Sequence, residues 1–376
     1  MRILVTTVAL PGHFFPLVPL AWAGRAAGHE VLVACAAEFV PTVLGSGLPA
    51  VSTGAGERFD DVSADDRPAA GLTQQRMAHG RVFGRMAARN VPGLTAIAKT
   101  WKPDLVISER AEFGGPLVAA KLGLPQVELH WGVAELPEYR TGAAAELAQR
   151  GLPAPPVPER LLNPWPPSLR KAYAARHEGI RTMSYNGEAR VPDWVMRPRR
   201  RPRICLTLGT VVPRSGSSQV AHGAVDIVRA LCGLGADVVV AIDDRIAASW
   251  PPLPAAVRHV GRLPLSQVFP ACDVAVHHGG QGTSLTALEA GLPQLVLPVF
   301  DDQFDNADAV VRAGAGVRML PQEVEPSAIA ARCAEILASD AYRPAAELVA
   351  AEIAAQATPV EVVRGLGWGG GLRRVA

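Results

Sequence analysis

The sequence predicts an α/β protein built from two doubly wound parallel-sheet domains in series. Each half of the chain alternates short runs rich in Val, Ile and Leu with amphipathic helical stretches. This alternation is typical of parallel sheets that helices cover on both faces. The 376 residues suffice for two domains of roughly 100–200 residues each. Hydrophobic residues make up 49% and charged residues 19%, which excludes a disordered chain.

The first half contains four apolar runs that predict buried strands. We expect a helix after the first of them, over Pro16–Gly28, because apolar residues recur there at helical spacing. Gly28 should end this helix, since glycine adopts the left-handed conformation of a helix C-terminus without steric cost. The predicted strands are Ile3–Val8, Glu30–Cys35, Asp104–Ser108 and Gln126–Trp131.

The second half repeats the alternation and predicts a second parallel sheet. Its expected strands are Ile204–Leu208, Asp237–Ile242, Val257–Gly261, Val274–His277, Gln294–Val299 and Gly316–Leu320. Its expected helices are Ser218–Leu234, Leu265–Ala271, Thr283–Ala290, Phe304–Ala313 and Pro326–Ala338.

The composition changes between the two arrays, and this change places the domain boundary. Gly151–Pro167 is rich in proline, which predicts an edge loop because proline cannot donate to a strand ladder. We expect one domain over residues 1–195, a solvated linker over 196–203 and a second domain over 204–360. Residues 361–376 should form a partly disordered C-terminal segment, because the glycine-rich tail has few side chains that can pack.

Charge and cysteine content limit the partners and the compartment. The 37 basic and 35 acidic side chains give a net charge of +2, too balanced to indicate a nucleic-acid binder. The arginine-rich run at 196–203 fits a linker better than a nucleic-acid or membrane patch. No apolar run approaches the roughly 18 residues of a membrane span. Five scattered cysteines without CxxC spacing predict a cytoplasmic protein without a disulfide framework.

The segment from Val274 to Gln303 carries the densest functional signal. A strand ends at paired histidines, and a glycine-rich turn then leads into a helix that Thr283 and Ser284 are expected to open. Glycines let a ligand approach the backbone, and free N–H groups at a helix start attract anions. The loop is neither a P-loop nor a dinucleotide fingerprint, since it lacks Gly-Lys-Ser/Thr and Pro11-Gly12-His13 follows the first strand. From these residues alone, a capped helix without any ligand remains an alternative.

The pattern H-H-G-G-x-G-T-x-x-x-A-x-x-A-G-x-P-Q runs from His277 to Gln294, and Asp302-Gln303 follows it. The chain thereby resembles actinobacterial natural-product glycosyltransferases of the GT-B fold, which use nucleotide deoxysugars, such as those of calicheamicin and macrolide biosynthesis. The resemblance covers most of the chain, including Gly12-His13, Pro103-Asp104-Leu105-Val106, Leu208-Gly209-Thr210 and Val260–Leu265.

The resemblance implies a donor site in the second domain. His278 would contact the donor diphosphate, and a histidine neighbour, His277, is interpreted as a buried side chain at the strand end. Backbone groups of Arg262 and Leu263 would contact the base, while Asp302 and Gln303 would bind sugar hydroxyls. The rest of the diphosphate cradle would comprise Gly209, Thr210, Gly279, Gly280, Gly282 and Thr283.

One departure from the family pattern concerns the ribose. UDP-glucose enzymes of this fold carry a ribose-binding Glu eight residues beyond the motif histidine, where this chain has Thr286. A deoxyribose offers one hydroxyl fewer to such a carboxylate. We therefore expect a dTDP-sugar as co-substrate, in preference to UDP-glucose.

The first domain is expected to supply the base and the acceptor pocket. His13 follows the first strand, where ligands bind in open α/β sheets, and an imidazole suits proton abstraction near neutral pH. In relatives an acid, most often Asp, follows the strand at 105–108 and orients this histidine. Glu109 holds that place here, with Glu112 nearby as an alternative partner. Candidate acceptor walls are Phe59, Met77, Phe83, Met86 and Trp131.

The expected reaction is metal-independent transfer with inversion, in which a small hydrophobic aglycone attacks the nucleotide sugar. We expect no cofactor and no metal, because the acidic pairs Asp60-Asp61 and Asp65-Asp66 fit a solvated loop. Three alternatives stay open: a lipid or cell-wall glycosyltransferase that uses a UDP-sugar, a nucleotide-sugar epimerase, and a non-catalytic auxiliary subunit that binds sugar nucleotides. The sequence also leaves open a homodimer and a helper protein.

Overall fold

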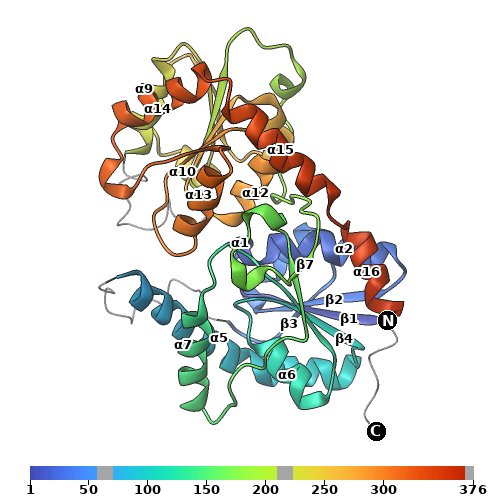
Figure 1. Ribbon diagram of the computed structural model, residues 1–376. Coiled ribbons are helices and arrows are strands. Elements are labelled where there is room, and N and C mark those ends of the chain that lie inside the picture. Colours follow the sequence, from blue (N-terminus) through green and yellow to red (C-terminus); the bar gives the residue numbers. More distant parts are fainter. Residues whose placement is uncertain (57–70, 210–222, 369–376) are drawn as a thin grey trace.

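The computed structural model describes residues 1–56, 71–209 and 223–368, and within them two parallel-sheet domains face each other (Figure 1). Sheet order is β3-β2-β1-β4-β5-β6-β7 in the N-terminal domain and β10-β9-β8-β11-β12-β13 in the C-terminal domain. The first strand of each domain therefore lies inside its sheet with later strands on both sides, as in a doubly wound fold. The predicted fold class is confirmed.

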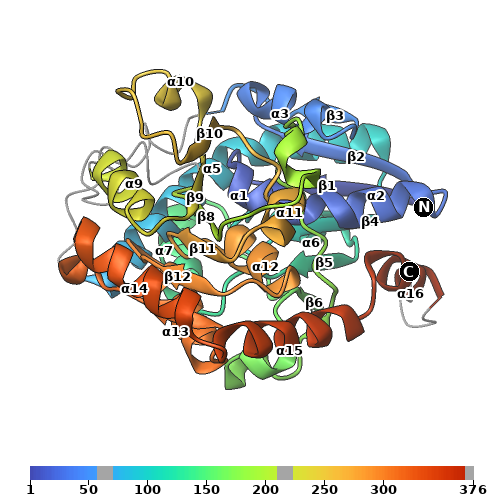
Figure 2. The same ribbon diagram turned by 90° about the horizontal axis from the view of Figure 1, so that it is seen from above.

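The N-terminal domain covers its sheet with helices on both faces (Figure 2). Its strands are β1 (Arg2–Thr6), β2 (Glu30–Cys35), β3 (Ala50–Ser52), β4 (Leu105–Glu109), β5 (Gln126–Leu129), β6 (Arg160–Asn163) and β7 (Glu178–Gly179). Its helices are α1 (Pro11–Phe14), α2 (Val18–Ala26), α3 (Val40–Gly45), α5 (Leu72–Trp101), α6 (Gly114–Leu122) and α7 (Pro137–Ala148).

The C-terminal domain has the same layered construction. Its strands are β8 (Arg203–Thr207), β9 (Asp237–Ala241), β10 (Val257–Gly261), β11 (Val274–His277), β12 (Gln294–Val296) and β13 (Gly316–Arg318). The helices that follow β8 are α9 (Ala224–Cys232), α10 (Asp244–Ala247), α11 (Leu265–Val268), α12 (Gln281–Glu289), α13 (Gln303–Arg312), α14 (Pro326–Ala338), α15 (Tyr342–Ala355) and α16 (Pro359–Trp368). Of the helix predicted at 218–234, residues 218–222 lie outside the described part of the chain.

The helix predicted at Pro16–Gly28 is divided. A 3₁₀ turn at Phe15–Leu17 separates α1 from α2, because Pro16 and Pro19 lack the N–H that a continuous helix requires. Gly28 ends α2 with a φ of 83°, in the left-handed conformation expected for it.

The proline-rich segment is not all loop, and this expectation was wrong for its second half. Arg160–Asn163 forms β6, which pairs with β5 on one side and with β7 on the other. Pro158 and Pro164 lie just outside the strand, so no ladder hydrogen bond is lost to proline.

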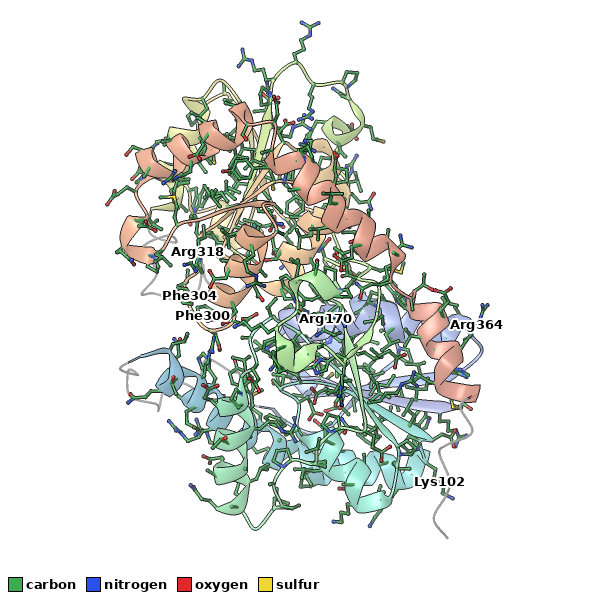
Figure 3. All side chains as sticks on the ribbon, in the orientation of Figure 1. Lys102, Arg170, Phe300, Phe304, Arg318 and Arg364 are labelled. Atoms are coloured by element: carbon green, nitrogen blue, oxygen red, sulfur yellow. The ribbon has the colours of Figure 1, made fainter. Side chains whose placement is uncertain are left out.

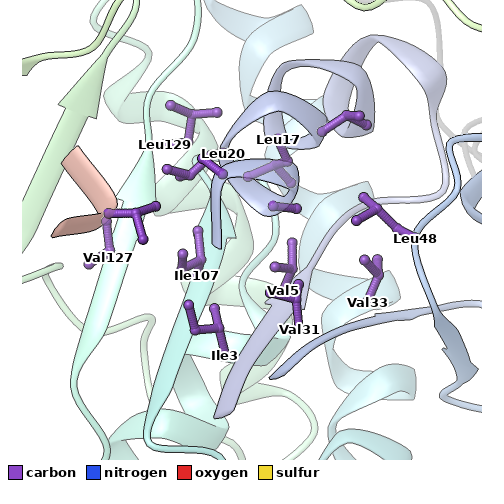
Figure 4. Packing of buried hydrophobic residues seen from close by; sticks show 14 of the residues in the cluster. Ile3, Val5, Leu17, Leu20, Val31, Val33, Leu48, Ile107, Val127 and Leu129 are labelled. Atoms are coloured by element: carbon purple, nitrogen blue, oxygen red, sulfur yellow. The ribbon is translucent and has the colours of Figure 1, made fainter. Parts of the chain in front are cut away.

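The core of the N-terminal domain forms where α2 and the turn before it pack on the sheet (Figure 4). Ile3, Ile107 and Val127 project from neighbouring strands and meet Leu17 and Leu20, all nearly inaccessible to solvent. Each of these side chains stabilises the fold by about 1.5–3 kcal/mol through burial of apolar surface.

The chain crosses back to the N-terminal domain at its end, and residues 361–368 of the C-terminal segment, which was expected to be partly disordered, belong to a helix. Helix α15 leads away from the C-terminal domain, and α16 packs against α2 (Figure 1). Val362, Val363 and Leu366 are buried in the same core as Ile3. Residues 369–376 lie outside the described part of the chain.

In the described residues, no helix combines the length and the apolar character that crossing a membrane would require.

Packing of α16 predicts a position-specific loss of stability. Val363 is fully buried, so Val363→Ala should lower the free energy of unfolding by about 2 kcal/mol through lost burial and a cavity. Val360, on the same helix, is 38% exposed, and Val360→Ala should change it by less than about 0.5 kcal/mol. Urea denaturation measures the free energy of unfolding of both variants. Equal and negligible changes would show that α16 is not packed against α2.

Candidate active site

A cavity of about 860 Å³ lies between the two domains, at the carboxyl ends of strands from both sheets. From the C-terminal domain it is lined by residues that the sequence predicts for the donor site: Gly209, Arg262, Leu263, His278, Gly280, Gly282 and Thr283. The N-terminal domain contributes Gly12, the 180–189 segment and residues of α3. Thr210 lies outside the described residues.

Helix α12 points its N-terminus into this cavity. The helix begins at Gln281 with Gly280 as its N-cap, two residues earlier than predicted, and no side chain caps it. The expectation that the Thr283 and Ser284 hydroxyls cap the helix was therefore wrong. The amides of Gln281, Gly282 and Thr283 precede the first helical hydrogen bond, so they are available to an anion.

The His278 ring packs closely against Gly209 and Gly280. A Cβ atom at Gly209 would lie 2.8 Å from His278 Nε2, and one at Gly280 would overlap the same atom. Burial, reinforced by neighbouring His277, lowers the pKa of His278 to about 3, so the ring is neutral at pH 7. Its buried Nδ1 has no hydrogen-bond partner among the described residues.

His277 is a buried structural histidine, as interpreted from the sequence. Its Nδ1 accepts a hydrogen bond from the Gly279 amide at 3.1 Å, and its Nε2 lies 2.7 Å from Gln294 Oε1. Burial lowers its pKa to about 4. A neutral ring with Nε2 protonated satisfies both contacts.

His13 and Glu109 form a buried pair in the N-terminal domain. His13 Nδ1 lies 3.0 Å from Glu109 Oε1. The other carboxylate oxygen accepts hydrogen bonds from Trp131 Nε1 at 2.7 Å and from the Ala111 amide at 2.8 Å. Burial alone would raise the pKa of Glu109, but the charge of His13 and these hydrogen bonds outweigh it and lower the pKa. The carboxylate is therefore ionised beside His13.

The alternative partner, Glu112, has a different role. Its carboxylate accepts hydrogen bonds from the Gly114 and Gly115 amides, both at 2.8 Å, and from the Thr6 hydroxyl at 2.6 Å. It thus caps the start of α6. Of the two acids, the structure places Glu109 at His13.

The predicted acceptor walls divide into two groups. Phe83 and Trp131 pack on the His13 ring with centroid distances of 5.5 and 4.9 Å, and Met86 belongs to the same buried cluster. Met77 is half-buried on α5, and Phe59 lies outside the described residues. None of these four described residues lines the cavity, so the cavity itself does not identify the acceptor site.

The two polar residues after β12 differ in their surroundings. Gln303 Oε1 accepts hydrogen bonds from the Val299 amide at 2.9 Å and from the Phe300 amide at 3.3 Å, so it holds its own loop. Asp302 accepts a hydrogen bond from Asn306 Nδ2 at 2.6 Å. Burial and the charge of Asp301 raise the pKa of Asp302 to about 7. Neither residue lines the cavity.

Residues 131–133 connect Glu109, the partner of His13, to the glycine loop, and no pattern in the sequence predicts this connection. The Trp131 indole donates to Glu109, and the next two amides donate to side chains of the other domain. Gly132 N–H binds Gln281 Oε1, while Val133 N–H binds Asn306 Oδ1 at 2.9 Å. Asn306 Nδ2 also donates to the Gly279 carbonyl at 3.0 Å. The two halves of the site are thus held together by neutral hydrogen bonds.

Among the described residues, no group of three or more His, Cys, Asp or Glu side chains is arranged to hold a metal ion. The acidic pairs Asp60-Asp61 and Asp65-Asp66 lie outside the described residues.

Family models match both domains. Residues 22–209 match the N-terminal domain of erythromycin biosynthesis protein CIII-like proteins, and residues 226–367 match their C-terminal domain. The chain belongs to this family. Proteins similar to this chain are named as sugar transferases. The chain is a glycosyltransferase of the GT-B fold.

Similar proteins of this family match over nearly the whole chain. L-demethylnoviosyl transferase of Streptomyces niveus is 39% identical over 97% of each chain. Tylactone mycaminosyltransferase of Streptomyces fradiae is 31% identical over 96% of this chain and 91% of its own.

Among solved structures, the glycosyltransferase SsfS6 of Streptomyces sp. SF2575, complexed with thymidine diphosphate, is 39% identical with a TM-score of 0.83, covering 97% of this chain and 99% of that one. The spinosyn rhamnosyltransferase SpnG, complexed with spinosyn aglycone, is 29% identical with a TM-score of 0.84, covering 97% and 100%. The resemblance inferred from the sequence is confirmed.

The packing of His278 predicts the effect of a methyl group. Gly280→Ala should displace the imidazole and weaken binding of a nucleoside diphosphate by about tenfold or more, as expected for loss of one anion contact. Gly365→Ala, at an exposed position of α16, is the matched control because its Cβ would meet only Arg160 at 3.8 Å. Calorimetric titration measures both; unchanged affinity in Gly280→Ala would exclude His278 from the anion site.

Proposed function

We propose that this glycosyltransferase moves a deoxysugar from a dTDP-sugar to a small hydrophobic aglycone, with inversion, with His13 as general base and without a metal. The observation that carries the proposal is the pairing of His13 with a buried, ionised Glu109 in one domain, together with a helix N-terminus, glycines and a neutral histidine that line the cavity in the other. Gly12, next to His13, lines the same cavity. Relatives whose structures contain thymidine diphosphate or an aglycone support both substrates.

The orientation of the His13 imidazole supports its role as the general base. An ionised carboxylate can only accept, so His13 Nδ1 carries the proton that Glu109 binds. In the neutral form of the ring, Nε2 then keeps the lone pair that a base needs. Nε2 would take the proton of the acceptor as its oxygen attacks the anomeric carbon. Glu109 then stabilises the imidazolium that forms, much as a buried Asp does in a serine protease triad.

Departure of the diphosphate requires stabilisation of developing negative charge. The free amides at the start of α12 and the helix dipole supply it at fixed positions, without reorganisation during the reaction. A neutral His278 can add one hydrogen bond. We infer that these groups replace the metal that other nucleotide-sugar enzymes use.

The preference for dTDP rests on Thr286. Its Oγ1 lies 2.6 Å from the Gly282 carbonyl oxygen and 2.9 Å from the Ser184 hydroxyl, so its hydrogen-bonding capacity is used inside the protein. No carboxylate is present at this position to accept the two hydroxyls of a ribose. A deoxyribose has one hydroxyl fewer than a ribose, so it loses fewer hydrogen bonds when that carboxylate is absent.

Substitution of the dyad should separate catalysis from donor binding. His13→Ala and Glu109→Gln should lower kcat by roughly 100-fold or more, because base catalysis commonly contributes that much, while leaving thymidine diphosphate affinity unchanged. His29→Ala, remote from the cavity, is the control for loss of a histidine. Near-normal turnover of His13→Ala would remove it from the role of base.

Donor preference is tested by calorimetric titration of the wild-type protein in EDTA. Thymidine diphosphate should bind about tenfold more tightly than uridine diphosphate, a difference of about 1.4 kcal/mol. Turnover in EDTA should equal turnover with added Mg²⁺. Tighter binding of uridine diphosphate would overturn the donor assignment, and dependence on Mg²⁺ would overturn metal independence.

A further inference from the structure

Asp301 has a backbone conformation that needs an explanation. Its φ of 59° lies in the left-handed region, which residues other than glycine, asparagine and aspartate rarely adopt. The residue is only 2% exposed and stands in the loop between β12 and α13. Such a conformation persists where the surroundings hold it, and it is common beside functional groups.

Three residues of the other domain hold Asp301 through polar contacts. Its Oδ2 accepts hydrogen bonds from His79 Nδ1 at 2.6 Å and from the Tyr139 hydroxyl. Arg76 Nη2 donates to its carbonyl oxygen at 3.1 Å and to the Asp305 carboxylate at 2.6 Å. Arg76 and His79 lie on α5 and Tyr139 lies on α7, so the N-terminal domain fixes both the side chain and the backbone of Asp301.

The neighbourhood is packed as well as polar. The Phe300 ring meets the His79 ring edge-on at 6.4 Å, and Figure 3 places Phe300 at the border of the C-terminal domain that faces α5 and α7. The Tyr139 ring packs on Phe83 and Trp131 at 5.2 and 6.1 Å, the same rings that contact His13. The contacts to Asp301 are therefore continuous with the wall of the base.

Asp301 sets the position of the residue that follows it. A Cβ built on Gly132 would lie 3.1 Å from Asp302 Oδ2, so the Asp302 carboxylate faces the loop that joins the base to the glycine loop. Its other constraint, Asn306, is itself bound to the Val133 amide. Rotation of the Asp301 backbone to an ordinary conformation would turn Asp302 away from this place.

We propose that Arg76, His79 and Tyr139 are positioning residues for the donor sugar. By holding Asp301 in the left-handed conformation, they keep the Asp302 carboxylate beside Gly132 at the domain boundary, where it would contact the sugar, so the N-terminal domain would determine how tightly the sugar is held in the other domain. This inference rests on the proposed dTDP-sugar donor and on Asp302 as its sugar contact. A purely structural role, in which these contacts only hold the domains together, is the outcome that the experiment must distinguish.

Tyr139→Phe removes one hydroxyl and keeps the ring that packs on Phe83 and Trp131. We expect the affinity for the intact dTDP-sugar and kcat/KM each to fall about tenfold, the effect of one buried hydrogen bond to a charged group. The affinity for thymidine diphosphate, which lacks the sugar, should stay within about twofold, although loss of a buried hydrogen bond should lower Tm by a few degrees. Tyr342→Phe is the matched control, because its hydroxyl makes only an exposed hydrogen bond, to Glu335.

Two substitutions of Asp301 separate backbone from side chain. Asp301→Gly allows the positive φ but loses the carboxylate, and it should show the same loss for the intact donor as Tyr139→Phe. Asp301→Asn keeps an oxygen for the Tyr139 hydroxyl and tolerates the left-handed conformation, so it should recover part of the affinity.

Equal losses of affinity for thymidine diphosphate and the intact donor would overturn the positioning role in favour of a structural one. Unchanged affinity for both ligands in all three variants would overturn it as well. Failure of the proposed function is distinguished in the wild-type protein, which would then bind uridine diphosphate and its sugars more tightly. In that case the affinities of the variants would be measured for uridine diphosphate and its sugars.

Discussion

The buried carboxylate of Glu109 is the group on which the rest of the site depends. A charge removed from water costs several kcal/mol unless charged or hydrogen-bonding partners surround it. Here His13, the Trp131 indole and the Ala111 amide provide those partners. Since His13 precedes α2 and Trp131 follows β5, a single carboxylate at the end of β4 fixes the relative position of three segments of the N-terminal domain.

The same carboxylate reaches the other domain through one loop. Trp131 binds Glu109, and the two amides that follow it bind Gln281 and Asn306 beside the glycine loop. Main-chain donors of the N-terminal domain thus locate the start of α12 relative to Glu109 and His13. Hydrogen bonds of this kind have strict geometry, and they would be lost if the domains moved apart by more than a few tenths of an ångström. The ion pairs of Asp301 with His79 and of Asp305 with Arg76 and Lys171 form a second connection between the domains. Electrostatic attraction acts over longer distances than a hydrogen bond.

Local sequence patterns predicted the two sheets well. Apolar runs of β-branched residues and the glycines between them favour strands and turns through interactions among a few neighbouring residues. Val274–His277 and Val257–Gly261 have the predicted bounds. The errors arose where distant contacts decide the outcome. β6 forms within a proline-rich segment because β5 and β7 pair with it, and α16 is ordered because α2 covers its apolar side. Helix α12 begins two residues early because Gly280 takes the extended conformation of an N-cap.

The sequence by itself determined the fold class and the glycine loop, and the resemblance to its family indicated His13, Glu109 and His278 as candidate site residues. Only the tertiary structure decided that Glu109 rather than Glu112 contacts His13, because both acids follow the same strand and differ only in which neighbours surround them. Only it brought Asp301 to His79 across 222 residues of chain. Contacts between domains leave no periodic pattern in a sequence, because they depend on how two separately folded sheets are placed against each other.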